Sequence, residues 1–260
     1  MSDPCLRILA DGVWRATRTP DGPARQRLRV VRRGVVQVDA WGPGADWLVE
    51  RAPALCGVLD HPEEFRPEHP LLRNLLSAHP GLRFGRSDAI FETALFVTLE
   101  QKIATREAYR NWRQMVHGLG DRAPGPLADL WVPPAPRKVA ATPYEVFHRF
   151  GIERRRAETL RRLAVVAPRL EETASLPLHA AYQRFQAVIG VGPWTAARIA
   201  MFGLGDDDAV FLDDLHVPDM VTSALAGERR GSDERMLELL EPFRGHRARV
   251  VRLLLARGPA

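Results

Sequence analysis

Hydrophobic residues near the start of the chain occur in short bursts, separated by turns of polar residues and glycine. In the last burst, Val36 and Val38 alternate with Gln37 and Asp39, which is the period-two pattern of a half-buried strand. The bursts together predict a small antiparallel sheet. Its expected strands cover residues 5–10, 13–17, 25–31 and 35–41.

From about residue 45 onward, apolar residues recur every three or four positions, as on one face of an amphipathic helix. Two proline-rich stretches interrupt this pattern: a connector at residues 61–70, and residues 123–143, which are predicted to be a surface loop. The helices expected after the connector cover residues 71–78, 90–104, 106–118, 144–150, 155–167, 178–188, 193–202, 219–226 and 232–256.

These elements predict an α+β fold that is mainly α. We expect two domains, a sheet domain with one or two helices at residues 1–65 and an all-helical domain at residues 66–260. The chain has 260 residues, of which 45% are hydrophobic and 27% charged, and this is the composition of an ordinary globular protein with a sizeable core.

The basic residues are almost all arginine. The formal net charge is +5, and Lys102 and Lys138 are the only lysines among 37 basic residues. The planar guanidinium suits phosphate oxygens, but a GC-rich genome produces the same bias without any function. Both explanations stay open.

Metal and membrane signals are weak. Cys5 and Cys56 are the only cysteines, so one chain cannot build a four-cysteine zinc site or iron–sulfur cluster. The eight histidines lack the spacings of helical zinc sites. The N-terminal residues do not resemble a signal peptide, and no run of about 20 apolar residues could cross a bilayer. We therefore expect a soluble, cytoplasmic protein with no membrane contact.

The segment with the clearest chemical meaning is residues 185–200. Gly190 and Gly192 flank Val191, and glycine both permits a tight hairpin and bares its backbone N–H. Pro193 follows at the position that proline prefers in a helix start. Free N–H groups and the positive end of the helix dipole would then face outward and suit a phosphate. The alternative is a plain turn between packed helices.

Residues 189–196 resemble the hairpin of the helix-hairpin-helix superfamily of DNA glycosylases, in which a catalytic Asp follows about twenty residues later. Asp214 lies at that distance, although alone it is equally typical of a helix N-cap or a solvated acid. The resemblance implies that Asp214 is the catalytic carboxylate between two helical lobes. It also implies that the DNA backbone is bound by Gly190, Val191, Gly192 and Thr195.

Over nearly the whole chain, the sequence is similar to the 3-methyladenine DNA glycosylase II branch of that superfamily. Residues 91–103 resemble its early helix, which ends in a glutamine-containing turn facing DNA, and residues 151–160 resemble its Gly-apolar-x-x-x-basic-Ala segment. The resemblance implies a monomer whose partner is double-stranded DNA with a damaged base, associated with the nucleoid if the protein is bacterial.

Trp194 stands where relatives with added lyase activity carry a lysine, which predicts hydrolysis without AP-lyase activity. Trp194 and Phe243 are expected to line the pocket for the flipped base, although both also suit a core. An alkylated purine carries positive charge and would stack on the indole. The resemblance therefore implies excision of alkylated bases such as 3-methyladenine in base excision repair.

Several points stay open. A glycosylase of the same fold for deaminated lesions, and a non-catalytic DNA-binding protein, remain alternatives. In related proteins a monovalent cation binds the hairpin, which would place it at Gly190 and Gly192; no other cofactor is expected. Glu100 departs from the branch pattern, so the DNA-intercalating residue is unassigned, as is any assistance to catalysis from Asp213 or His216.

Overall fold

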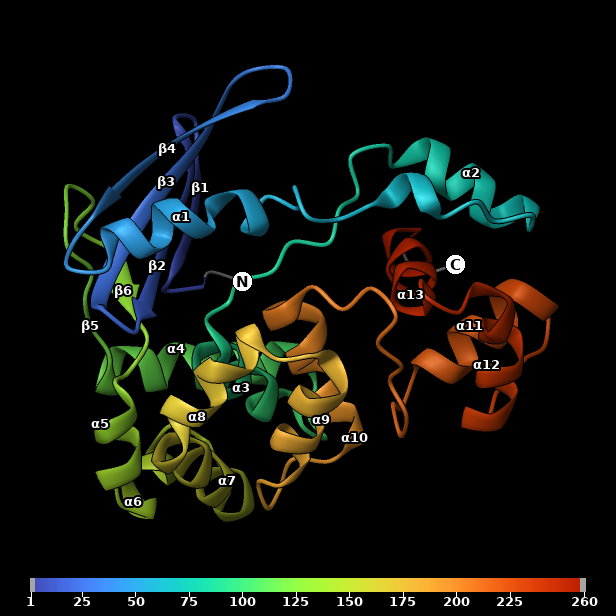
Figure 1. Cartoon of the computed structure of the whole chain (residues 1–260). Helices are drawn as coiled ribbons and strands as arrows, with labels where there is room; N and C mark the ends of the chain where they lie inside the picture. Colours follow the sequence, from blue (N-terminus) through green and yellow to red (C-terminus); the bar gives the residue numbers. More distant parts are fainter. Residues whose placement is uncertain (1–2, 258–260) are drawn as a thin grey trace.

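A four-stranded antiparallel sheet in the order β1-β2-β3-β4 begins the chain, as the sequence pattern predicts. The computed structural model describes residues 3–257. The sheet lies at one end of the molecule and helices fill the rest (Figure 1). The strands are β1 (Leu6–Leu9), β2 (Gly12–Thr19), β3 (Gly22–Arg32) and β4 (Val35–Trp41).

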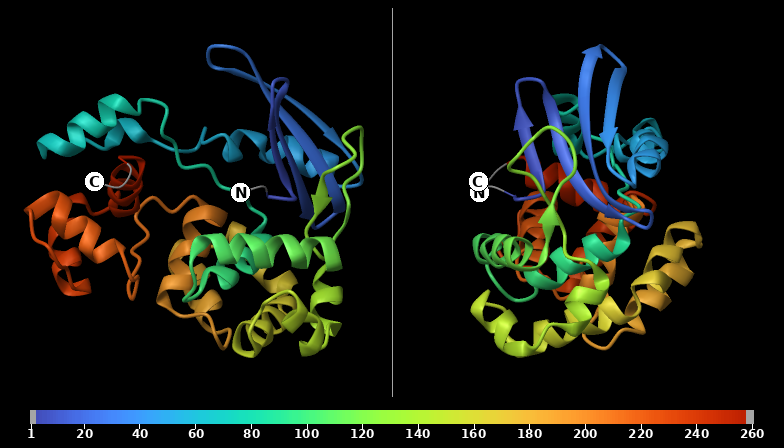
Figure 2. Two further views of the ribbon diagram at one scale, coloured as in Figure 1. Left: turned by 180° about the vertical axis from the view of Figure 1, so that it is seen from behind. Right: turned by 90° about the vertical axis from the view of Figure 1, so that its left-hand side faces the viewer.

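The outer half of the β3–β4 hairpin contradicts the half-buried face predicted for β4. Figures 1 and 2 show this hairpin projecting beyond the rest of the molecule. Val30 is 73% exposed and Val36 is 40% exposed, because the described part of the chain covers neither side of the tip. The alternation therefore identifies a strand but not a buried face.

The inner part of the sheet is covered on both faces. Helix α1 (Ala45–Leu55) packs against β3 and β4 on one face. On the other face lies the stretch 123–143, and its prediction as a surface loop is wrong because Leu130 and Val132 are fully buried beside Trp14. The stretch contains β6 (Trp131–Val132), which pairs with β5 (Asp121–Arg122), and helix α5 (Pro136–Ala141).

Two helical lobes follow, each with its own hydrophobic core. No helix in residues 3–257 is both long enough and apolar enough to cross a membrane. Besides α5, the first lobe contains α3 (Ile90–Glu100), α4 (Thr105–Leu119), α6 (Tyr144–Arg149), α7 (Arg154–Val165), α8 (Ala167–Glu171), α9 (Leu178–Gln186) and α10 (Pro193–Ile199). The second contains α2 (Pro70–Ala78), α11 (Val217–Ala226), α12 (Asp233–Leu240) and α13 (Arg247–Ala256).

Helix α10 belongs to both cores. Ala196 and Ile199 pack into the first lobe, whereas Ala197 packs into the second, together with Met201 of the π-helical turn Ala200–Leu204 that continues α10. Trp194, in the first turn of α10, packs against both. Helix α10 therefore lies between the two lobes, and its N-terminal end lies where they meet.

Two predicted helices end differently in the structure. The helix expected at residues 90–104 stops at Glu100, after which Gln101 leaves the helix and Lys102 has a φ of 54°. The helix expected at residues 232–256 is two helices, because Pro242 cannot continue the hydrogen-bond ladder and Gly245 reverses the chain with a φ of 93°.

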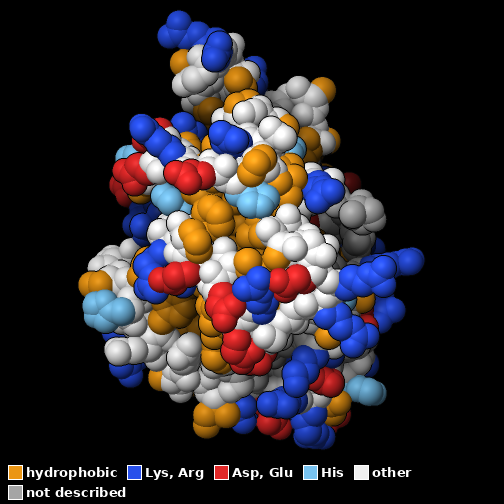
Figure 3. All heavy atoms as spheres, turned by 90° about the vertical axis from the view of Figure 1, so that its right-hand side faces the viewer, with side chains coloured by type: hydrophobic (Ala, Val, Ile, Leu, Met, Phe, Trp, Pro, Cys, Tyr) orange, Lys and Arg blue, Asp and Glu red, His pale blue; other side chains and the backbone are white. Residues whose placement is uncertain are grey.

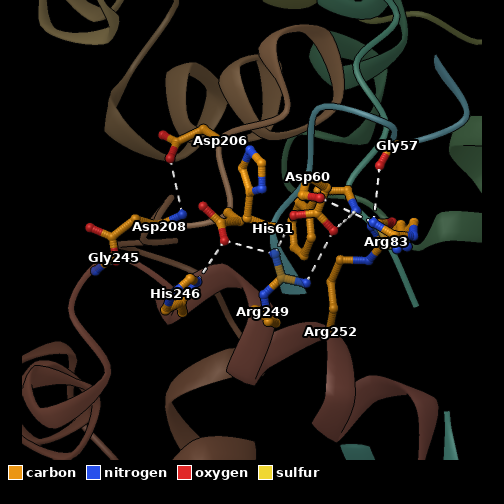
Figure 4. Close-up of polar contacts among 12 residues, drawn as sticks. Gly57, Asp60, His61, Arg83, Asp206, Asp208, Gly245, His246, Arg249 and Arg252 are labelled. Atoms are coloured by element: carbon orange, nitrogen blue, oxygen red, sulfur yellow. Dashed lines mark hydrogen bonds and ion pairs between the residues drawn. The ribbon is translucent and has the colours of Figure 1, made fainter. Parts of the chain in front are cut away.

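Buried ion pairs join the second lobe to the linker from the sheet, beyond the C-terminal end of α10 (Figure 4). Arg249 of α13, which is 1% exposed, binds the linker carboxylate of Asp60 and, at 2.8 Å, the carboxylate of Asp207. The second oxygen of Asp60 accepts a bond from the amide of Phe84 at 2.9 Å. Because the buried guanidinium of Arg249 pairs with carboxylates of both Asp60 and Asp207, the cluster fixes the linker onto α13.

Glu171, the last residue of α8, caps the start of α3. Its two carboxylate oxygens accept bonds from the amides of Ile90 and Phe91, both at 2.9 Å. Burial raises the pKa of Glu171 from 4.5 to about 7, although these two bonds oppose the shift. The folded chain therefore holds this proton more tightly than the unfolded chain does.

The free energy of unfolding should consequently fall as the pH rises from 4.5 to about 7, by about 3 kcal/mol from this group. Glu171→Gln should flatten that decline, measured by chemical denaturation between pH 5 and pH 8. The matched control is Glu172→Gln at the exposed neighbouring acid, which should keep the decline. An unchanged decline in E171Q would refute the assignment of the proton to Glu171.

Candidate active site

The predicted hairpin lies between α9 and α10 and projects at the bottom of Figure 1. Gly190 has a φ of 100°, and a Cβ at this residue would lie 2.1 Å from Oγ1 of Thr159 in α7. Only glycine permits both this backbone conformation and this close approach. Gly190 is therefore required by the fold itself.

Gly192 has no such structural requirement. Its φ of −89° suits any residue, and a Cβ there would meet nothing within 4 Å. It is the N-cap of α10 but has no side chain to cap the helix. Among the described residues, no hydrogen-bond acceptor is present for the amides of Gly192, Trp194 and Thr195. The open space and the free amides leave room for an anion outside the protein.

Gln101, at the end of α3, braces the hairpin from inside. Its Nε2 donates to the carbonyl oxygen of Gly190 at 3.0 Å and to Oγ1 of Thr195 at 2.9 Å. Thr195 is 3% exposed, so its hydroxyl faces inward and only its amide is left for DNA. The carbonyl of Gly190, one of the two residues predicted to bind a cation, is engaged by this bond.

Asp214 lies in the loop just ahead of α11, before Leu215 and the N-cap His216, and contacts both lobes. Its Oδ1 accepts bonds from the amides of His216 at 2.9 Å and Val217 at 3.0 Å, so it caps that helix. Its Oδ2 accepts a bond from the indole Nε1 of Trp194 at 2.7 Å. The structure thus brings the predicted carboxylate and the predicted hairpin tryptophan into direct contact, and it also makes Asp214 a helix cap.

The two neighbours of Asp214 point elsewhere. Asp213 is exposed, has a φ of 62°, and its amide donates to Asp233 at 2.8 Å. The side chain of His216 is exposed, and His216 reaches Asp214 only through its backbone amide. Phe243 is partly buried and packs edge-to-face on Phe65, at 6.2 Å between ring centroids, against the core of the second lobe. Its role in a base pocket stays a prediction.

The sequence did not single out Arg198, which lies one turn beyond Trp194 on α10. Its Nη2 binds Oε2 of Glu100 at 2.6 Å, and its guanidinium lies 5.4 Å from the ring centroid of Trp194. Glu100 therefore faces inward, which explains how an acid is tolerated beside a surface proposed for DNA. The sequence could have indicated Arg198, because a residue four positions after Trp194 in the same helix lies beside it on the helix surface.

A second polar cluster lies at the opposite end of α10. A cavity of about 280 Å³ there is lined by His61, Glu64, Arg86, Asp207 and His246, beside the buried Arg249 pairs (Figure 4). About ten helical residues, or about 15 Å, separate this end from Trp194. The cavity is therefore distinct from the contact between Trp194 and Asp214.

Charge is unevenly placed on the outer face of the second lobe. In Figure 3, basic side chains gather at the lower right of this view and also occur at its top and left, and acidic side chains lie nearer its centre. Within residues 3–257 no group of three His, Cys, Asp or Glu is arranged to hold a metal, and both Cys5 and Cys56 are free.

Comparison with known proteins gives one curated relative and several structures. No family model matches the chain. YfjP of Bacillus subtilis (strain 168), provisionally named as a DNA-3-methyladenine glycosylase, is 24% identical over 148 residues, which is 55% of this chain and 50% of YfjP. The chain thus spans half the length of this relative.

The structural similarity covers almost the whole chain. A 3-methyladenine DNA glycosylase from Archaeoglobus fulgidus superposes with a TM-score of 0.81 at 21% identity, covering 97% of this chain and 89% of that one. An 8-oxoguanine glycosylase/lyase from Clostridium acetobutylicum, bound to double-stranded DNA, gives 0.71 at 17% identity and 99% of both chains. The chain therefore has the fold of the helix-hairpin-helix DNA glycosylases.

Proposed function

We propose that this protein is a DNA glycosylase that hydrolyses the N-glycosidic bond of a damaged base flipped out of duplex DNA. The observation that carries the proposal is the carboxylate of Asp214, held at the meeting point of the two lobes by Trp194 and by the first amides of α11. The fold shared with DNA glycosylases supports it.

The contacts of Asp214 suggest how it would act. A carboxylate offers about four lone-pair directions, and here three are used, two on Oδ1 and one on Oδ2. The free direction on Oδ2 can accept a hydrogen bond from the attacking water. The same negative charge would stabilise the oxocarbenium-like sugar that forms as the base leaves.

The hairpin is proposed to grip the phosphate backbone beside the damaged nucleotide. Its free amides and the vacant volume at Gly192 would receive phosphate oxygens, and the helix dipole of α10 would favour their charge. One structure of similar fold, the 3-methyladenine DNA glycosylase Mag1 of Schizosaccharomyces pombe, is bound to abasic DNA. It superposes with a TM-score of 0.57 at 16% identity and covers 79% of this chain and 94% of that one.

The lesion has two candidate classes. Alkylated purines such as 3-methyladenine are supported by the sequence resemblance and by the names of YfjP and the Archaeoglobus protein. Neutral lesions, oxidised or deaminated, are favoured by one observation: the indole of Trp194 already carries the guanidinium of Arg198 against it.

Hydrolysis without strand cleavage is the proposed outcome, because Trp194 occupies the position of the lyase lysine. Of the two lysines, Lys102 is the one to test for lyase chemistry, because it directly follows Gln101, whose side chain bonds to the hairpin at Gly190. The side chain of Lys102 is exposed, whereas that of Asp214 is partly buried where the two lobes meet.

Asp214→Asn should reduce excision at least about 100-fold in single-turnover assays, because the amide lacks the negative charge. The amide oxygen of Asn can still accept the bonds from the amides of His216 and Val217, so the thermal midpoint should change little. Asp213→Asn, at the exposed neighbouring acid, is the matched control and should retain activity. Near wild-type excision by D214N would refute the catalytic assignment.

Gly192→Ala should leave the thermal midpoint unchanged and weaken binding to duplex DNA at least about tenfold, because the new Cβ takes the space proposed for a phosphate oxygen. Gly190→Ala should instead destabilise the fold by about 1–3 kcal/mol, since its φ is positive. Fluorescence anisotropy and thermal denaturation separate the two effects. Unchanged DNA binding by G192A would argue against the proposed contact.

Sodium borohydride should trap no covalent complex between the protein and DNA carrying an excised site, because the hairpin contact to Asp214 is made by Trp194, which has no amine to form an imine. A trapped complex that disappears in Lys102→Ala would assign lyase chemistry to that amine and overturn the monofunctional proposal. Lys138→Ala is the control for a random surface amine.

A further inference from the structure

Trp194 and Arg198 lie one turn apart on α10, and Phe202 follows in the π-helical turn Ala200–Leu204 that continues it. The guanidinium of Arg198 lies 5.4 Å from the ring centroid of Trp194 and 4.9 Å from that of Phe202. The indole Nε1 of Trp194 donates to the carboxylate of Asp214. A cation, an aromatic ring and the proposed catalytic carboxylate are therefore contiguous.

Glu100 binds the guanidinium of Arg198 but accepts a hydrogen bond from only one of its nitrogens. Arg198 and Glu100 are joined at 2.6 Å, with side chains 20% and 12% exposed. Nε of Arg198 is buried and lacks a hydrogen-bond partner among residues 3–257. A guanidinium has five N–H donors, and among the described residues Nη2 is the only guanidinium nitrogen of Arg198 with a hydrogen bond. Because Nε is buried, the donors left for an acceptor outside the protein are those on the Nη nitrogens.

We propose that Arg198, held by Glu100, forms the wall of the base site that selects neutral bases bearing a carbonyl oxygen over positively charged alkylated purines. This inference rests on the proposed glycosylase function and narrows its substrate class. A base that stacks near Trp194 must lie beside a cation that is already there. A carbonyl oxygen would accept its spare N–H donors, whereas a cationic base would meet like charge.

The matched probes are duplexes carrying one hypoxanthine or one 7-methylguanine, because both bases present the same O6 carbonyl and differ in charge. Each excision rate is divided by the spontaneous release rate from the same duplex. Wild-type protein should then enhance hypoxanthine release more than 7-methylguanine release. Arg198→Ala should lower the hypoxanthine enhancement about 10- to 100-fold, as expected for loss of a charge-assisted hydrogen bond, and leave 7-methylguanine equal or faster.

Glu100→Gln tests the same wall in the other direction. It removes the counter-charge of Arg198, so the preference for hypoxanthine over 7-methylguanine should increase. Arg184→Ala is the matched control, because Arg184 is also ion-paired, at 2.5 Å to Glu172, but lies on α9. It should leave both rates unchanged.

The outcomes separate the inference from the proposed function. Equal losses on both probes in R198A would mean that Arg198 only supports Trp194, and would overturn the inference while the glycosylase function stands. A wild-type preference for 7-methylguanine would do the same. Release of neither base, nor of 3-methyladenine, would overturn the proposed function and the inference together.

Discussion

The hydrogen bond between the Trp194 indole and the Asp214 carboxylate is the constraint on which the rest of the site depends. Trp194 belongs to the helix that begins at the hairpin, and Asp214 belongs to the start of α11. This one bond therefore joins the element proposed to hold DNA to the element proposed to act on it. A shift of the hairpin relative to α11 would be transmitted directly to the carboxylate.

The C-terminal end of α3 supports that bond from behind. Gln101 fixes the hairpin, Glu100 fixes Arg198 against Trp194, and Arg156 of α7 donates to the carbonyl oxygen of Leu99 at 3.3 Å. Leu99, Glu100 and Gln101 thus each bond to a different element: Leu99 to α7, Glu100 to α10 and Gln101 to the hairpin. This explains why α3 stops at Glu100 although its apolar spacing continues.

Local signals in the sequence were sufficient for part of this site. Gly190 and Gly192 could be predicted as a hairpin because the backbone chemistry of glycine is visible in the sequence, whereas Asp214 was predicted only through the resemblance to the glycosylase superfamily. The pair of Arg198 and Glu100 was not, because its members lie 98 positions apart and meet only when α3 packs on α10. A motif with a fixed local spacing cannot reveal a partner that is so distant in the sequence.

The same limit applies to burial in the fold. The alternating residues of β4 correctly indicated a strand, but its exposed tip depends on the absence of a covering element among the described residues. Leu130 and Val132 lie among prolines that indicate a loop, yet their apolar side chains fill a gap under Trp14. Composition describes a segment, whereas burial depends on what the rest of the chain places against it.

The cluster of Asp60, Asp207 and Arg249 has a consequence for how such proteins can be recombined. Asp60 and Arg249 are 189 positions apart, one in the linker after the sheet and one in the last helix. A chimera that takes its sheet and linker from one relative and its last helix from another would inherit half of a buried charge pair unless both parents carry it. The linker and α13 therefore form one module for exchange, despite their distance in sequence.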